Sequence, residues 1–220
     1  MKIDNLLGFN QIICMMLLII IGTLGRYTLV SLGLQPFPNF EIVMVLTLIA
    51  AIFLKPTFAI AVPLFSMLIS DLLLGNSVYM GNQMNKIILF TYSGFALIAL
   101  STIFNRERIR QGFGDIKLKN IGIAAGLGIG FVLIYDVWTN LGWWYLIYPH
   151  SINSMALVFS AGLPFMIYHM LSAALTFIVV GLPIITFVSK RTSIELPLNL
   201  DNKHWIPAII ITLVLILISL

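Results

Sequence analysis

Residues 40–76 read FEIVMVLTLIAAIFLKPTFAIAVPLFSMLISDLLLGN, which is two apolar segments separated by Lys55 and Pro56. A helix needs about 20 apolar residues to cross the hydrocarbon core of a bilayer, and the second segment approaches that length. The second segment nevertheless contains Asp71, with no basic residue near it in the sequence. Because a charged group inside a bilayer is costly unless it faces a cavity or a partner, Asp71 indicates a polar site among the helices.

The rest of the chain has the composition of a membrane protein. Of its 220 residues, 60% are hydrophobic and 9% are charged, whereas about a quarter are charged in a usual soluble domain. The pattern predicts an all-helical, polytopic membrane bundle with spans near 11–34, 40–54, 57–75, 86–104, 120–138, 157–188 and 205–220. The sixth span is too long for one straight crossing, and we expect Pro164 to divide it into an outer segment and a crossing helix.

Basic residues predict how the bundle is oriented. The loops 105–119 and 189–204 contain most of the Lys and Arg residues, whereas the loops 35–39, 76–85 and 139–156 contain none. Since cytoplasmic loops carry the excess of Lys and Arg, we expect a cell-membrane protein with a cytoplasmic N-terminus and an external C-terminus. The first apolar segment is longer than that of a signal peptide, so we expect it to be retained as a span.

No catalytic motif is found along the chain. P-loop, HExxH and CxxC patterns are absent from the sequence, and Cys14 is the single cysteine. We therefore expect no enzyme activity, no cofactor and no metal site, and any ATPase must be another chain. His150 and His169 lie on different elements, which favours hydrogen-bonded histidines over a metal site or a proton relay. The basic cluster 106–119 is too short to indicate nucleic acid. It favours a solvated determinant of membrane orientation, with attraction to anionic membrane lipid as the secondary alternative.

A small-molecule pocket is predicted at the outer ends of the spans. Arg26, Asp71 and Asp136 lie there, and the outer loops are rich in amides that hydrogen-bond and aromatic rings that stack on planar ligands. The predicted substrate-binding residues are Arg26, Asn39, Asp71, Asn140, Trp143, Trp144 and His150. Two alternatives stay open: the charged residues form a structural ion-pair network, and the aromatic residues are anchors at the membrane interface.

Over roughly residues 11–188 the chain resembles the substrate-binding S components of energy-coupling-factor (ECF) transporters. The resemblance rests on Arg26, Pro38-Asn39-Phe40, Ala50-Ala51, Asp71 with Gly75, Tyr148-Pro149 and the AGLPF segment 161–165, and it is closest to a branch with a PNF-containing outer loop. It implies a six-helix membrane domain with both termini cytoplasmic that binds a vitamin-like micronutrient at the outer face. It also implies docking on an ECF transmembrane coupling subunit that is driven by two ATPases. We expect residues 1–188 to form this domain, followed by a cytoplasmic loop and an extra span within 189–220.

Two features differ from that family. The apparent seventh span places the C-terminus outside, and the first helix offers Gly22 and Gly25 in place of the AxxxA pattern by which many members contact the coupling subunit. Span five also has a stripe of Gly122, Gly126 and Gly130, which lets a neighbouring helix approach closely, either within this chain or from another subunit. An alternative function is therefore a non-transporting assembly subunit of a larger membrane complex that keeps the same fold.

Overall fold

The helices of the bundle follow the predicted spans closely. The structure is a computed structural model that describes residues 3–33, 42–76, 79–80, 83–113, 115–191 and 202–219. Its elements are α1 (Ile3–Ser31), α2 (Ile42–Phe53), α3 (Pro56–Leu73), β1 (Tyr79–Met80), β2 (Gln83–Met84), α4 (Lys86–Gly112), α5 (Leu118–Ile147), α6 (Ile152–Thr176), the π-helical turn η1 (Phe177–Gly181), α7 (Leu182–Arg191) and α8 (Asn202–Ser219). The two strands form one short antiparallel pair.

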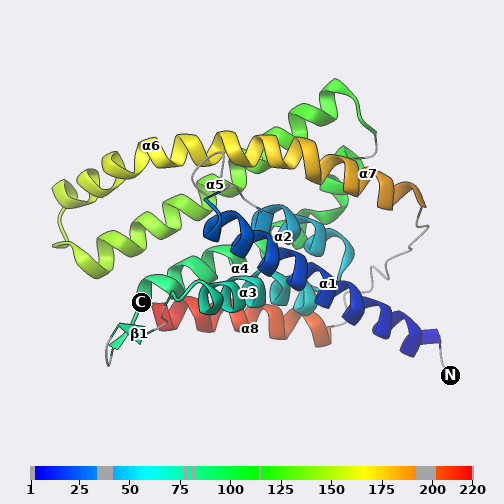
Figure 1. Cartoon of the computed structure of the whole chain (residues 1–220), viewed down its shortest axis with the longest axis horizontal. Helices are drawn as coiled ribbons and strands as arrows, with labels where there is room; N and C mark the ends of the chain where they lie inside the picture. The colour runs from blue at the N-terminus through cyan, green and yellow to red at the C-terminus, as the bar shows by residue number, and fades with distance from the viewer. Residues whose placement is uncertain are drawn as a thin grey trace.

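The helices are arranged as a bundle with a long helical hairpin along it. Helices α1, α2, α3, α4 and α8 pack on one another, and α5 pairs with α6 and also lies against α4. Figure 1 shows that the turn between α5 and α6 extends beyond the other helices, at the same end of the molecule as β1 and the end of α8. The start of α1 and the end of α7 lie at the opposite end.

Helix α2 is the centre of the bundle. It has 12 residues, of which those from Val43 to Ile52 are all buried. Its length of about 18 Å is well below the roughly 30 Å hydrocarbon core. Because α1, α3, α4 and η1 enclose it, the short helix meets protein instead of lipid, as expected for a helix that is apolar on all sides. The chain then turns at Lys55, and Pro56 starts α3 at the helical position where its missing N–H costs nothing.

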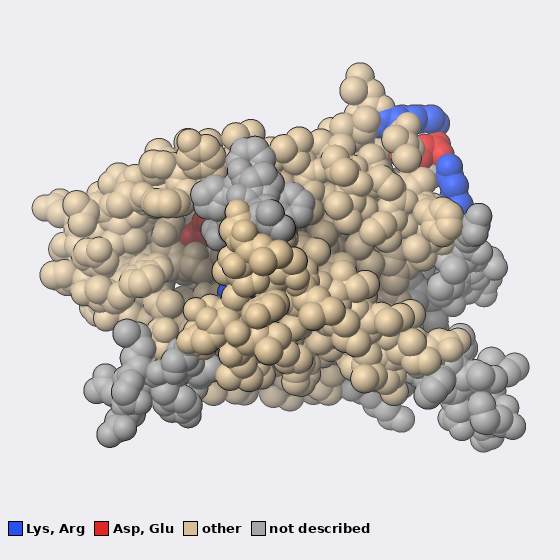
Figure 2. Space-filling view, viewed as in Figure 1, with Lys and Arg blue, Asp and Glu red and all other residues tan. Residues whose placement is uncertain are grey.

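The surface is that of a multi-pass membrane protein. Among the described residues, five helical segments are long and apolar enough to cross a membrane, and large apolar side chains are exposed along α1, α5, α6 and α8. Figure 2 shows a face with little charge, apart from one end and the inside of a hollow. The predicted fold class, an all-helical membrane bundle, is confirmed.

Two expectations about the last third of the chain are wrong. Helix α6 continues through Pro164, and the irregular turn comes later, at Phe177–Gly181; helices in membranes tolerate proline when local adjustments satisfy the freed backbone groups. Residues 139–156 are not a loop, because α5 runs on to Ile147 and α6 begins at Ile152. The helix ends only where Tyr148 is forced into an extended conformation before Pro149.

Helix α8 belongs to the same bundle. It packs against α4 and α3, and its buried residues include Ala208 and Thr212, small side chains four residues apart that allow close approach.

At the end of the molecule where α4 and α5 connect, Asp115 contacts Lys117 at 2.9 Å and Lys190 at 3.2 Å. These two ammonium groups hold the pKa of the exposed Asp115 carboxyl below its ordinary value. The contacts tie the α4–α5 connection to α7.

Candidate functional site

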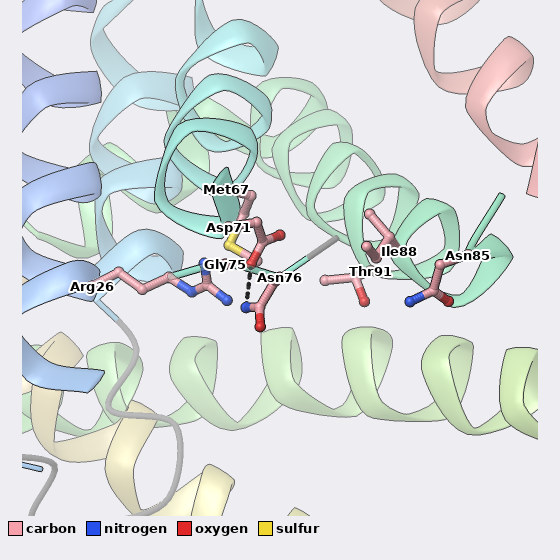
Figure 3. Close-up of a pocket in the computed structure, with 8 residues that line it drawn as sticks. All are labelled: Arg26, Met67, Asp71, Gly75, Asn76, Asn85, Ile88 and Thr91. Carbon is pink, nitrogen blue, oxygen red and sulfur yellow. Dashed lines mark hydrogen bonds and ion pairs between the residues drawn. The ribbon is translucent and has the colours of Figure 1, made fainter. Parts of the chain in front are cut away.

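A cavity of about 350 Å³ opens between α1, α3 and α4. It lies where α3 ends and α4 begins, and Figure 3 shows residues of all three helices converging on it. The lining residues are Arg26, Met67, Asp71, Gly75, Asn76, Asn85, Ile88 and Thr91. We call this cavity the ligand cavity. It combines charged, amide, hydroxyl and apolar groups in one small space.

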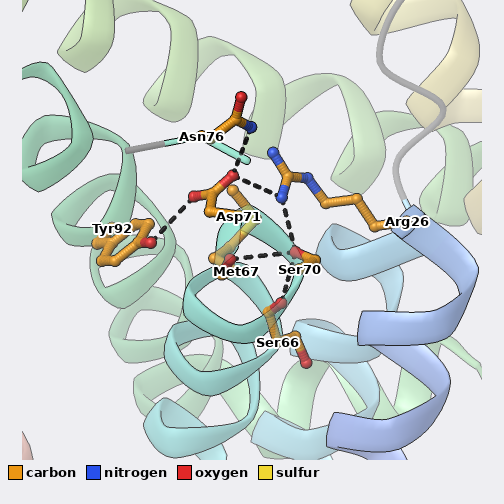
Figure 4. A network of polar contacts seen from close by, with 7 residues as sticks. All are labelled: Arg26, Ser66, Met67, Ser70, Asp71, Asn76 and Tyr92. Atoms are coloured by element: carbon orange, nitrogen blue, oxygen red, sulfur yellow. Dashed lines mark hydrogen bonds and ion pairs between the residues drawn. The ribbon is translucent and has the colours of Figure 1, made fainter. Parts of the chain in front are cut away.

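The ligand cavity is built around an ion pair between α1 and α3. The Arg26 Nη1 atom lies 2.7 Å from Asp71 Oδ1, and the two side chains are 21% and 6% exposed. The same nitrogen donates to Ser70 Oγ at 2.6 Å, and the Ser70 hydroxyl donates in turn to the Ser66 carbonyl oxygen at 2.6 Å. Figure 4 shows these contacts as one connected network. The pair therefore cross-links two helices at a point where neither charge is isolated in lipid.

Asp71 is surrounded by donors. Its Oδ1 also accepts from Asn76 Nδ2 at 3.0 Å, and its Oδ2 accepts from the Tyr92 hydroxyl at 2.9 Å. Three side chains on α1, α4 and the end of α3 thus stabilise one carboxylate that is 4% exposed. A buried carboxylate whose oxygens accept from several side chains in this way is held in place.

Arg26 has hydrogen-bonding capacity left over. A guanidinium carries five N–H donors, and both contacts of Arg26 use Nη1. Within the described part of the chain, Nε and Nη2 have no hydrogen-bond partner, and Figure 4 shows the second terminal nitrogen pointing away from Ser70, without a dashed line to any labelled residue. Since Arg26 lines the ligand cavity, these donors are available to an acceptor inside it.

Four of the other predicted substrate-binding residues lie at the α5–α6 turn or on the helices next to it, and none of the four is among the described residues that line the ligand cavity: Asn140, Trp143, Trp144 and His150. Asn140 packs against Gly162, since a Cβ on that glycine would lie 2.9 Å from Asn140 Nδ2. Trp143 is 46% exposed, and Trp144 donates to Ser154 Oγ at 3.1 Å. These contacts hold α5 against α6.

His150 closes the same turn. Its ring stacks on Tyr145 with ring centroids 5.1 Å apart, lies 5.4 Å from the ring of Trp144, and places Nε2 2.9 Å from the Tyr145 carbonyl oxygen. The remaining predicted residue, Asn39, lies outside the described residues.

Asp136 belongs to a separate pair. Its carboxylate oxygens lie 2.9 and 3.1 Å from His169 Nδ1, and the side chains of His169 and Asp136 are 2% and 14% exposed. The sequence placed Arg26, Asp71 and Asp136 together at the outer ends of three spans. The structure divides them into an α1–α3 pair and an α5–α6 pair.

The sequence reading missed Ser70 and Tyr92. Ser66 and Ser70 are four residues apart, which puts them on one face of α3, and Asp71 follows directly in the sequence. That spacing indicated a polar face on the helix that carries Asp71. Tyr92 gave no such signal, because its contact with Asp71 depends on how α3 and α4 cross. Among the described residues, no group of three or more His, Cys, Asp or Glu side chains could hold a metal ion.

The five glycines predicted to lie at helix-packing or partner interfaces fall into two groups, one that faces helices of this chain and one that does not. Gly22 and Gly25 face helices of the same chain: a Cβ at Gly22 would lie 2.6 Å from Ser66 Oγ, and one at Gly25 would lie 2.5 Å from Ile42 Cδ1. A Cβ at Gly122, Gly126 or Gly130 would meet no described atom within 4 Å. The stripe on α5 is thus open within the described chain, which favours a partner from outside it.

One family matches most of the chain. The family, described as "Family of unknown function (DUF6580)", matches residues 8–196. No curated protein and no solved structure matches. Because the match covers well over half of the 220 residues, the chain belongs to this family.

Proposed function

We propose that this member of the DUF6580 family is a substrate-binding membrane subunit that captures a small, vitamin-like organic micronutrient at the outer face of the cell membrane. As the resemblance to S components implies, it would deliver this ligand through an ECF-type coupling subunit and its ATPases. The observation that supports the proposal best is the ligand cavity, which holds an arginine with spare donors beside a carboxylate that is already satisfied.

The chemistry of the ligand cavity favours a ligand with an anionic or strongly accepting group. Asp71 is occupied by Arg26, Asn76 and Tyr92, so it holds Arg26 in place and does not itself attract a cationic ligand. Among the described residues Arg26 Nε and Nη2 have no hydrogen-bond partner, and these donors suit a carboxylate, which a guanidinium binds in a planar, two-bond geometry. Asn85 adds an amide, and Met67 and Ile88 supply apolar walls. A volume of about 350 Å³ lies within the range of small-ligand sites, roughly 300–1,000 Å³.

The place of the ligand cavity in the bundle fits capture from outside. It opens beside the α3–α4 connection, which contains neither Lys nor Arg between Gly75 and Asn85. The basic α4–α5 connection belongs to the other end of α4. If basic loops are cytoplasmic, the ligand cavity faces the exterior.

Binding to purified protein tests this proposal. A panel of vitamins and related carboxylic acids is screened by the shift in melting temperature, and the expected result is one class of carboxylate that stabilises the protein at micromolar concentration. Arg26→Lys retains a positive charge for Asp71 but loses the planar fork of donors. Since a hydrogen bond to a charged group is worth about 1.5–3 kcal/mol, Arg26→Lys should weaken binding roughly tenfold or more.

Lys119→Ala is the matched control, because Lys119 is exposed at the start of α5 and far along the chain from the cavity. It should bind like the unchanged protein. The proposal fails if no compound in the panel shifts the melting temperature and no ATPase module co-purifies with the protein.

The open glycine face supports one alternative, an assembly subunit without transport. Gly122 and Gly126 are exposed on α5 and have no neighbour within 4 Å in the described chain, which suits a helix of another protein. Cross-linking in native membranes separates the two functions. A coupling subunit with ATPases supports transport, and an unrelated membrane complex supports assembly.

A further inference from the structure

A second cavity, of about 410 Å³, lies between the last turns of α4 and the first half of α5. We call it the α4–α5 groove. Its lining includes Asn105 and Arg108 from α4, and Ile123, Leu127, Gly130 and Ile134 from α5. It is close to the basic α4–α5 connection, so it lies toward the opposite end of α4 from the ligand cavity.

Among the described residues that line the groove, Arg108 is the one cation, Ser101 and Asn105 are polar, and the rest are apolar. Asn105 uses its Nδ2 to donate to the Ser101 carbonyl oxygen at 2.9 Å, and the α5 side is almost entirely aliphatic. Arg108 is exposed, and no contact to an acid is seen for it within the described residues. A lone guanidinium beside an aliphatic channel is complementary to a ligand with an anionic head and a hydrocarbon tail.

The depth of the groove matches one leaflet of a bilayer. From Ile123 to Ile134 the α5 wall rises by about 16 Å, and half of the hydrocarbon core is about 15 Å. A Cβ on Gly112 would lie 3.1 Å from Ile123, so the two residues lie at the same height along the bundle, next to the basic α4–α5 connection. Arg108 is one turn deeper than Gly112, about 6 Å. An arginine at that depth meets lipid phosphates by extending its side chain toward the surface.

Glycine keeps the groove open. A Cβ at Gly130 would meet nothing within 4 Å, and the exposed Gly126 and Gly122 continue on the same helical face, beside the groove. The absence of a side chain at Gly130 leaves room for an acyl chain in the groove. The surrounding bilayer supplies phospholipid at high local concentration.

We propose that the α4–α5 groove binds an anionic phospholipid of the leaflet next to the basic connection. Its phosphate contacts Arg108, and one acyl chain lies along Leu127, Gly130 and Ile134. This site is independent of the proposed substrate binding, since it shares no lining residue with the ligand cavity.

Native mass spectrometry of the purified full chain tests the head-group contact. The protein is exchanged into nanodiscs that contain equal amounts of phosphatidylglycerol and phosphatidylcholine, and the lipids that remain bound after release are counted. The unchanged protein should retain phosphatidylglycerol about fivefold better, the effect of one basic residue at an anionic surface. Arg108→Gln should abolish this preference and Arg108→Lys should keep it, whereas Arg110→Gln, outside the groove, should leave it unchanged.

A second pair of variants tests the acyl chain. Gly130→Leu fills the groove and should displace the bound lipid of either head group, whereas Gly122→Leu, equally open but outside the groove, should not. The proposal is overturned if the unchanged protein shows no preference, or if Arg110→Gln lowers it as much as Arg108→Gln. It is also overturned if inorganic phosphate displaces the lipid, which indicates a simple anion site, or if Gly130→Leu breaks a dimer or a complex instead of releasing lipid.

Discussion

Asp71 is a buried carboxylate that the protein stabilises with donors from three different elements. Arg26 comes from α1, Tyr92 from α4 and Asn76 from the end of α3. Neutralisation by Arg26 alone would leave Oδ2 without a donor, and Tyr92 supplies it. The arrangement explains why an acid is tolerated in the segment 68–76. It also leaves Arg26 with N–H donors that have no partner among the described residues and that line the cavity.

Removing the Asp71 side chain should destabilise the protein, because Arg26 then loses its ion-pair partner. We expect Asp71→Ala to lower the free energy of unfolding by about 3 kcal/mol, because breaking a buried pair leaves one charge uncompensated. The double variant Arg26→Ala with Asp71→Ala should be destabilised by clearly less than the sum of the two single variants. Thermal and denaturant unfolding in detergent measure these differences.

Tyr92→Phe is the finer control for the same network. It removes one hydrogen bond to a charged group while the Arg26–Asp71 pair remains, so we expect the free energy of unfolding to fall by about 1.5–3 kcal/mol.

For the double variant, strictly additive effects of Arg26→Ala and Asp71→Ala would show that the two residues act independently and that the ion pair contributes nothing to the fold.

At the scale of the helices, the sequence predicted the spans well and their ends less well. Apolar length located the helices of the bundle, since a membrane helix satisfies its backbone internally and needs only apolar side chains outward, but only five of the described helical segments are long and apolar enough to cross a membrane. The same reasoning treated polar residues as loop. It missed that α5 continues through Asn140 to Ile147 and that α4 continues to Gly112. Helices do not end at the membrane surface, and local signals such as Pro149 and the Ser151–Ser154 capping box mark the real boundary.

Close packing of α5 on α6 depends on one glycine that the sequence did not distinguish from its neighbours. A Cβ at Gly128 would lie 2.8 Å from the carbonyl oxygen of Ala173, which is backbone and does not move aside easily. Gly128→Ala should lower the free energy of unfolding by about 1–3 kcal/mol. Gly126→Ala, two residues away and in open space, should be neutral or stabilising by up to about 1 kcal/mol, because alanine favours a helix.

Unfolding in detergent compares these two variants directly. Equal destabilisation by Gly128→Ala and Gly126→Ala would contradict the α5–α6 packing described above.

At the scale of the molecule, the two cavities lie toward opposite ends of α4 and differ in chemistry. The Arg26–Asp71 region could be predicted from the sequence, because charges in apolar spans are rare and must meet something. The separation of that region from Trp143, Trp144 and His150 could not, since it depends on how far the α5–α6 hairpin extends beyond its neighbours. Residues at the same predicted depth thus belong to different sites.

The direction of α8 decides how the whole molecule lies in the membrane. Figure 1 places the end of α8 at the same end of the molecule as β1, opposite the start of α1. If the basic α4–α5 connection is cytoplasmic, as the distribution of Lys and Arg predicts, a cysteine at Ser219 or at His150 should react with an impermeant maleimide on intact cells. A cysteine at Gln111, near the end of α4, should react only after permeabilisation.

Cys14 is replaced by serine in all these variants, because it is an exposed free cysteine. Labelling of Ser219→Cys with the pattern of Gln111→Cys would place the end of α8 in the cytoplasm. Because α8 packs along α4 and α3, that outcome would require a different bundle from the one described, and not merely a reversed orientation.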